Sequence, residues 1–315
     1  MPQTRTMDPS FLSTEDAPAT LRRYGRFTLI KNAFIRFRYG DGFSHSRALA
    51  LQLVLALVPL GIAFIGLSST VRADGVAKVL REVLLRVTPG ATDEIVKQTL
   101  DQGRTLEQGQ LALWIGLGVA LLALTLAMGQ VERGANRIYG IQRDRPSTSK
   151  YLRAAGHAAT AGILSVTGFL VIVTGGTVGA VLARTYGWTD RQEGIWLALR
   201  FPVGVLLALA SFTVLINRAP RRRQPGWSWT GIGAGVALTL WLLFTYLLSL
   251  YVEVSGSFGS TYGPLTGIVA LLLWANLTSI ALFLGIAFSA QLEAVRAGVA
   301  DPERGDPEEG RAETA

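Results

Sequence analysis

Six stretches of this chain are long enough and apolar enough to cross a lipid bilayer as helices. A bilayer core about 30 Å thick needs roughly 20 such residues in α-helix. Buried helices of a soluble domain rarely run that long without a charged side chain. We therefore expect an all-α fold, a polytopic membrane bundle with six transmembrane helices. The stretches lie at about residues 47–69, 111–130, 158–183, 195–216, 229–252 and 264–290.

The composition of the chain excludes several kinds of site. The 315 residues include no Cys, which removes disulfides, Fe–S clusters and Cys-ligated zinc. The two histidines, His45 and His157, are too few for a multi-His metal site and stand in different spans or loops. Each is expected to pack or to lie at an interface. We therefore expect no metal and no other cofactor.

The distribution of Lys and Arg predicts the orientation in the membrane, because basic residues accumulate in cytoplasmic loops. The segments on the side of both termini hold 21 basic residues, and those on the other side hold 8. Both termini should therefore be cytoplasmic, in a multi-pass protein of the bacterial inner membrane. The net charge of +8 is then expected to attract anionic inner-leaflet lipids, at about 1 kcal/mol per basic side chain, and not nucleic acid.

Outside the spans the chain divides by polarity. Residues 1–20 are polar and contain three Pro, so we expect a disordered cytoplasmic tail. Residues 21–297 form the membrane domain, and residues 298–315 form an acidic cytoplasmic tail. Within the domain, two short extracytoplasmic amphipathic helices are expected at about 74–109, separated by Pro89-Gly90. Sequence does not decide whether residues 70–110 form a lid.

The segment 21–39 has a helical apolar stripe among basic residues. A basic amphipathic helix of this kind is typical of one that lies on a membrane surface. The alternative is a helix that packs against the bundle. Both interpretations remain open from the sequence. The stripe consists of Phe27, Ile30, Ala33, Phe34 and Phe37.

No motif predicts catalysis. There is no G-x-S-x-G nucleophile turn and no P-loop, and the G-x-G-x-G at 231–235 lies inside an apolar helix instead of following a strand. Hydrolysis of RNA would need paired carboxylates with a metal, or a pair of histidines. We therefore expect no enzyme activity.

Four residues inside the spans are candidates for a cavity or hinge. Pro59 interrupts the first span, and broken helices can line a binding site, although a simple packing kink is the alternative. Arg200 is an ionisable residue within the fourth span, near its outer end. Gln52 and Asn276 are neutral polar residues in the first and last spans.

Two G-x-x-x-G pairs are candidates for close helix packing, since small residues let helix backbones approach. They are Gly175 with Gly179, and Gly231 with Gly235. The pairs fit packing within one chain as well as a homo-oligomer.

An ordered set of motifs resembles the YihY/BrkB family of inner-membrane proteins, formerly labelled ribonuclease BN. The resemblance covers roughly residues 21–297. The motifs are the Pro-containing opening span at 40–59, ANRIYGIQRDRP at 135–146, Tyr-Gly-Pro-Leu at 262–265, Leu-Leu-Trp at 272–274 and Leu-Gly at 284–285.

The chain also departs from the family pattern. The family commonly carries Gly-Ala-Glu-Leu-Asn near the end of the last span, where this chain has Ala287 at the acidic position and Ser289 at the polar one. Ala56 replaces a small polar residue before the first-span Pro. A mechanism that relies on that carboxylate therefore does not carry over.

The resemblance implies six transmembrane helices without a settled activity. We expect a transporter or translocator of an amphipathic or lipid-like substrate. The alternative is a non-transporting scaffold, or an envelope-integrity or virulence-associated factor. A nuclease is disfavoured. The substrate, the direction of transport and its energy coupling do not follow from the sequence.

Overall fold

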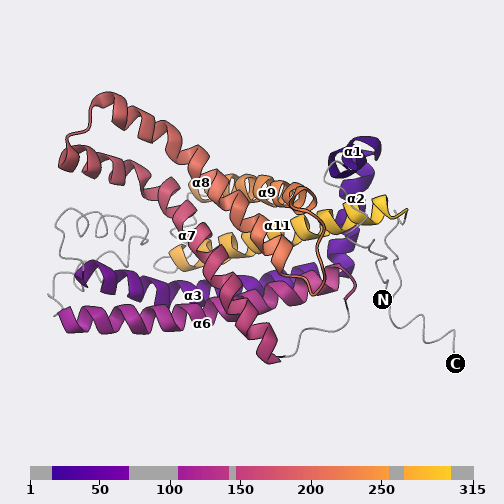
Figure 1. Cartoon of the computed structure of the whole chain (residues 1–315), viewed down its shortest axis with the longest axis horizontal. Coiled ribbons are helices and arrows are strands. Elements are labelled where there is room, and N and C mark those ends of the chain that lie inside the picture. Colours follow the sequence, from indigo (N-terminus) through magenta and orange to yellow (C-terminus); the bar gives the residue numbers. More distant parts are fainter. Residues whose placement is uncertain (1–15, 71–105, 142–146, 255–265, 299–315) are drawn as a thin grey trace.

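The computed structural model describes residues 16–70, 106–141, 147–254 and 266–298, and every regular element in these ranges is an α-helix. Figure 1 shows long helices that run roughly along one axis, with short helices across one end. In chain order the helices are α1 (Asp16–Arg23), α2 (Arg26–Tyr39), α3 (Gly42–Thr70), α6 (Leu106–Ile138), α7 (Ser147–Tyr186), α8 (Asp190–Arg218), α9 (Trp227–Val254) and α11 (Thr266–Arg296).

The six long helices coincide with the six predicted spans, and the fold is helical as expected. Five of them, α3, α6, α8, α9 and α11, are long and apolar enough to cross a membrane. The remaining long helix, α7, covers the predicted span at 158–183 but is not among those five. A count of six transmembrane helices therefore stays a prediction.

The apolar windows of these helices are mostly uncovered by the rest of the chain. Only 28% of the α3 window and 11% of the α9 window is buried inside the protein. Large apolar side chains such as Leu55, Leu122 and Tyr246 are exposed on the outside of the bundle. Exposing so much apolar surface to water is unfavourable, so the helices require lipid around them. The chain is therefore a membrane protein.

Two pairs of helices, α3 with α6 and α9 with α11, are in close contact at glycines. A Cβ atom added to Gly116 of α6 would lie 2.8 Å from the Pro59 carbonyl oxygen of α3. A Cβ atom added to Gly285 of α11 would lie 2.6 Å from the Gly233 carbonyl oxygen of α9. At these two points the backbones touch, with no room for a side chain. Helix α11 also packs against α3, so it joins the two pairs into one bundle (Figure 1).

The helix α2 divides its apolar residues between two environments. Leu29, Ala33 and Phe37 are buried, and α2 packs against α11. Phe27 and Ile30 are 82% and 60% exposed. Packing against the bundle is therefore correct for part of the predicted stripe, and the rest remains an exposed apolar face.

Part of the predicted N-terminal tail is helical. Helix α1 begins at Asp16, within the stretch 1–20 that we expected to be disordered. Ala17 and Thr20 are buried, and Ala17 joins a small apolar cluster with Trp229 and Leu292. This contact stabilises a helix that the local composition does not predict. Residues 1–15 lie outside the described residues.

Of the segment 74–109, where two short helices are predicted, the structure describes only residues 106–109. Residues 71–105 lie outside the described residues, and α6 already begins at Leu106. The acidic tail and the turn at 255–265 also lie outside them.

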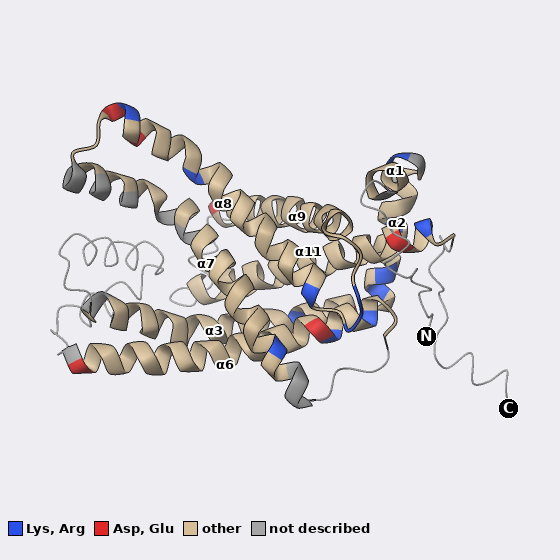
Figure 2. Cartoon of the chain, viewed as in Figure 1, with Lys and Arg blue, Asp and Glu red and all other residues tan. Residues whose placement is uncertain are grey.

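Basic side chains gather at one end of the bundle. Figure 2 shows most of the described Lys and Arg around α2 and near the ends of α6, α8 and α11. We call this region the basic end, and it includes Arg36, Arg153, Arg218 and Arg222.

Candidate functional site

A carboxylate is buried at the basic end of the bundle. The side chain of Glu293, near the end of α11, is 1% exposed. Its Oε2 accepts a hydrogen bond from Arg222 Nη2 at 2.6 Å, which is also an ion pair. Its Oε1 accepts a hydrogen bond from Tyr139 Oη at 3.3 Å. Three segments that are distant in sequence therefore meet at one carboxyl group.

The loop after α8 is fixed to the end of α6 by further contacts. The Arg222 guanidinium carbon lies 4.7 Å from the centroid of the Tyr139 ring, a cation–π contact. The backbone N–H of Arg221 donates to Asn136 Oδ1 at 2.8 Å. These contacts place the Arg222 side chain against Glu293.

A second arginine approaches from α2. Arg36 Nε donates to Gln291 Oε1 at 3.1 Å, and both side chains are buried. Burial lowers the pKa of Arg36 to about 10, although Tyr139 and Glu293 act in the opposite direction. Arg36 therefore stays charged at neutral pH. Burial, and then the charge of Glu293, raises the pKa of Tyr139, so the phenol stays protonated as a donor. We call Arg36, Tyr139, Arg222, Gln291 and Glu293 the Glu293 network.

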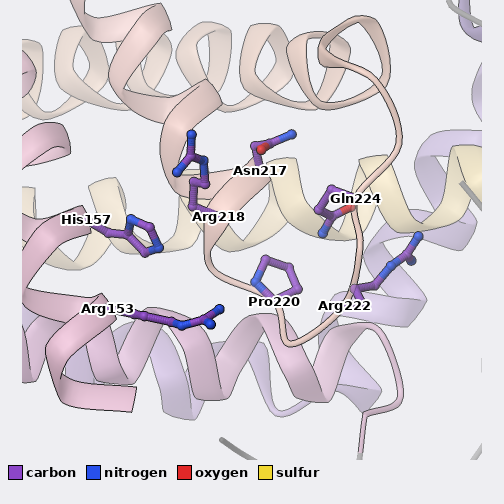
Figure 3. Close-up of a pocket in the computed structure, with 7 residues that line it drawn as sticks. All are labelled: Arg153, His157, Asn217, Arg218, Pro220, Arg222 and Gln224. Atoms are coloured by element: carbon purple, nitrogen blue, oxygen red, sulfur yellow. The ribbon is translucent and has the colours of Figure 1, made fainter. Parts of the chain in front are cut away.

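Beside this network lies a cavity of about 440 Å³. Figure 3 shows Arg153 and His157 extending from α7 toward the loop at Pro220, while Arg222 extends away from them. The cavity thus lies between the start of α7 and the end of α8. Its lining residues are Arg153, His157, Asn217, Arg218, Pro220, Arg222 and Gln224.

The four predicted cavity residues lie on three helices. Pro59 is buried where α3 meets α6. Gln52 Oε1 of α3, Arg200 Nε of α8 and Asn276 Oδ1 of α11 are buried without a hydrogen-bond partner. In the described part of the chain no hydrogen bond joins any of these residues to another. Arg200 instead packs against Gly175 and lies 4.7 Å from the ring of Phe201.

The two glycine pairs have different surroundings. Gly175 and Gly179 of α7 lie against Arg200 and Trp196 of α8, and Trp196 Nε1 donates to the Gly175 carbonyl oxygen. A Cβ atom on Gly231 or on Gly235 would meet nothing within 4 Å. The second pair therefore faces away from the other helices that the structure describes.

The two histidines belong to separate environments. His45 Nδ1 shares a hydrogen bond of 2.7 Å with Gln130 Nε2, between α3 and α6. His157 lines the cavity from α7.

The Glu293 network does not follow from the sequence alone. One signal was present, because an acidic residue in the last turn of a helix opposes the helix dipole and requires a nearby cation. The basic loop at 217–228 could supply that cation, but the sequence does not show which of its four arginines does so.

A family profile matches most of the chain. The family is described as Virulence factor BrkB, and the match spans residues 33–311. The chain belongs to the BrkB family. The resemblance to YihY/BrkB proteins is therefore confirmed.

Curated relatives are similar over most of this BrkB chain. The ribonuclease-like protein YfkH of Bacillus subtilis is 26% identical over 273 residues, 84% of this chain and 95% of YfkH. The UPF0761 membrane protein Smlt0865 of Stenotrophomonas maltophilia is 25% identical over 276 residues, 84% of this chain. AZOSEA40600 of Aromatoleum aromaticum, another UPF0761 membrane protein, is 28% identical over 252 residues, 78% of this chain.

The chain spans 61% and 58% of the lengths of these two UPF0761 proteins. No solved structure matches the BrkB chain.

Proposed function

We propose that this BrkB-family membrane protein translocates an amphipathic, lipid-like substrate across the bacterial inner membrane. The observation that carries the proposal is the set of buried polar atoms without partners in the apolar helices. They include Gln52 Oε1, Arg200 Nε, Asn276 Oδ1 and Thr278 Oγ1.

Buried polar atoms without hydrogen-bond partners destabilise the folded protein unless they serve a function. A buried polar group without a hydrogen bond costs about 1–3 kcal/mol, and polar residues at membrane depth are rare outside substrate and ion pathways. A polar headgroup that passes along these helices would supply the missing partners. The exposed apolar surfaces of the same helices would accommodate its acyl chains.

Purified protein in liposomes tests the proposal. A fluorescent phospholipid analogue placed in the inner leaflet should become accessible to an external quencher faster than in protein-free liposomes. Replacing Gln52→Leu together with Asn276→Leu should slow this movement. The matched control is Thr239→Val, because Thr239 on α9 is exposed and donates to the Gly235 carbonyl oxygen of its own helix.

Correctly inserted protein that moves no lipid analogue would contradict the proposal. Movement that is equally fast in the double variant would contradict the role of the polar atoms.

The family description supports a second function, that of a virulence-associated factor. In this alternative we propose that the chain scaffolds other proteins, or maintains the envelope, without transport. This function predicts a partner that co-purifies stoichiometrically with the chain and liposomes without flux. The open surface at Gly231 and Gly235 is then a contact surface for that partner or for a second copy.

We also propose that the chain is not a nuclease, although YfkH is named ribonuclease-like. The separate surroundings of His45 and His157 support this proposal, since neither histidine lies beside the other. Incubation of purified protein with RNA and Mg²⁺ or Mn²⁺ should leave the RNA intact. Cleavage that disappears in His45→Ala or His157→Ala would reverse this conclusion.

A further inference from the structure

The cavity between α7 and α8 has the dimensions and chemistry of a ligand site. Its volume of about 440 Å³ falls within the range of about 300–1,000 Å³ found for ligand pockets. It lies at the basic end and shares Arg222 with the Glu293 network, and the translocation proposal makes no use of it.

The charge of the cavity is positive. Three arginines and a histidine line it, and none of the described lining residues is acidic. Glu293 neutralises the charge of Arg222. In the described part of the chain no acidic side chain pairs with Arg153 or Arg218, and both are exposed at the mouth. Two positive charges are therefore available to an anion.

Neutral donors complete the lining. Asn217 precedes Arg218 at the end of α8, and Gln224 lies on the loop that borders the cavity (Figure 3). Arg222 Nη1 is buried without a hydrogen-bond partner. A buried donor without a partner is unfavourable, and an acceptor-rich ligand would satisfy this group.

We propose that this cavity binds a phosphate group, carried by an anionic lipid headgroup or by a soluble phosphate compound. The planar guanidinium fork matches phosphate oxygens, and charge-assisted hydrogen bonds to phosphate are about twice as strong as neutral ones. A cavity at the ends of membrane-spanning helices is placed where lipid headgroups lie, and basic pockets between such helices bind phosphorylated headgroups. The inference stands whether or not the chain translocates lipid.

Binding to the detergent-solubilised full chain tests the site. The probes are inorganic phosphate and dihexanoyl-phosphatidylglycerol, with zwitterionic dihexanoyl-phosphatidylcholine for comparison, each titrated by calorimetry. The variants are Arg153→Gln, Arg218→Gln and the two together. The matched control is Arg191→Gln, because Arg191 is exposed at the opposite end of the same helix as Arg218.

Each single variant should weaken binding about ten- to a hundredfold, which is the loss expected for one hydrogen bond to a charged group. The double variant should bind too weakly to measure, and Arg191→Gln should bind within about twofold of the unaltered chain. Unchanged thermal unfolding of the variants would show that their fold is intact.

The probes distinguish the two sources of the phosphate group. Binding of phosphatidylglycerol alone assigns the site to a lipid headgroup, and binding of inorganic phosphate alone assigns it to a soluble compound. Mutual competition shows that both use the same phosphate contacts. The proposal is overturned if neither probe binds, or if Arg191→Gln weakens binding as much as Arg218→Gln does.

Discussion

Glu293 places a carboxyl group in the last turn of α11, where the helix dipole already makes the backbone negative. The position becomes favourable through its partners. Arg222 provides a cation at 2.6 Å and Tyr139 provides a neutral hydrogen-bond donor. These side chains come from the end of α6 and from the loop after α8, so one residue connects three segments.

Removing one member of this ion pair should cost more than removing both. Arg222→Leu leaves the Glu293 carboxylate buried without its cation, which should destabilise the protein by about 3 kcal/mol. Arg222→Leu combined with Glu293→Leu should recover most of that loss. Thermal or chemical unfolding of the protein in detergent measures both effects.

The neighbouring Arg223 is the control for this experiment, since its side chain is exposed. Arg223→Leu should change stability by less than about 0.5 kcal/mol. If Arg222→Leu proves no more damaging than Arg223→Leu, the ion pair does not stabilise the fold.

Two glycines of α9 that are two residues apart should respond oppositely to the same substitution. A Cβ atom on Gly233 would lie 2.7 Å from the Gly285 carbonyl oxygen, so Gly233→Ala should destabilise by about 1–3 kcal/mol. Gly235→Ala meets nothing within 4 Å and should leave stability unchanged or raise it by up to about 1 kcal/mol. Unfolding midpoints of the two variants compare them directly, and equal shifts would contradict the close packing of α9 against α11.

Among the elements, α2 is the one whose environment the sequence left open. Its apolar stripe indicated a helix with one buried face but not what covers that face. The structure places Leu29 and Phe37 against the bundle and leaves Phe27 and Ile30 exposed. We infer that the exposed residues enter the adjacent lipid surface, since water disfavours a contiguous apolar patch.

Spin labels can measure the depth of α2, because the chain has no Cys to compete with an introduced one. A label at Ile30→Cys should collide more with oxygen, which concentrates in lipid. A label at the neighbouring exposed position, Lys31→Cys, should collide more with a water-soluble nickel chelate. Equal nickel accessibility at both positions would show that α2 lies in water.

The sequence predicted the long helices well and their ends less well. The predicted spans began at 47 and 158, whereas α3 begins at Gly42 and α7 at Ser147. A hydropathy window ends where polar residues begin, but a helix continues into the interface, where water and headgroups accept polar side chains.

The sequence could not predict the site, for a different reason. The cavity and the Glu293 network are assembled from loop and helix-end residues whose proximity depends on how the helices pack. Arg153 and Arg218 look like ordinary positive-inside residues until α7 and α8 lie side by side. Gln52 and Asn276 are candidates from the sequence alone, because polar residues stand out against an apolar background, and their role in a site stays a prediction.

At the scale of the whole molecule, the basic end defines an orientation. The basic residues surround α2 and the ends of α6, α8 and α11, whereas the acidic residues of the first turn of α8, Asp190 and Glu193, lie at the other end (Figure 2). We infer that the basic end faces the cytoplasm, where anionic lipid and the positive-inside rule favour it.

Reporter fusions test this orientation. Fusions after residues 145 and 222 should report a cytoplasmic position, and fusions after residues 90 and 258 should report an external one. The reverse pattern would overturn the charge argument. Agreement at 145 and 222 but not at 90 would show that the first two long helices do not both cross the membrane.

The side-chain hydrogen bond between Arg36 and Gln291 joins residues that are 255 positions apart in the sequence. A ribosome at about 5–20 residues per second needs on the order of 10 to 50 s to synthesise that interval. During this time α2 has been synthesised but α11 has not, so the apolar face of α2 that α11 later covers must be shielded by the membrane. Assembly therefore finishes only when α11 arrives, and a chain truncated before α11 lacks both Glu293 and the partner of α2.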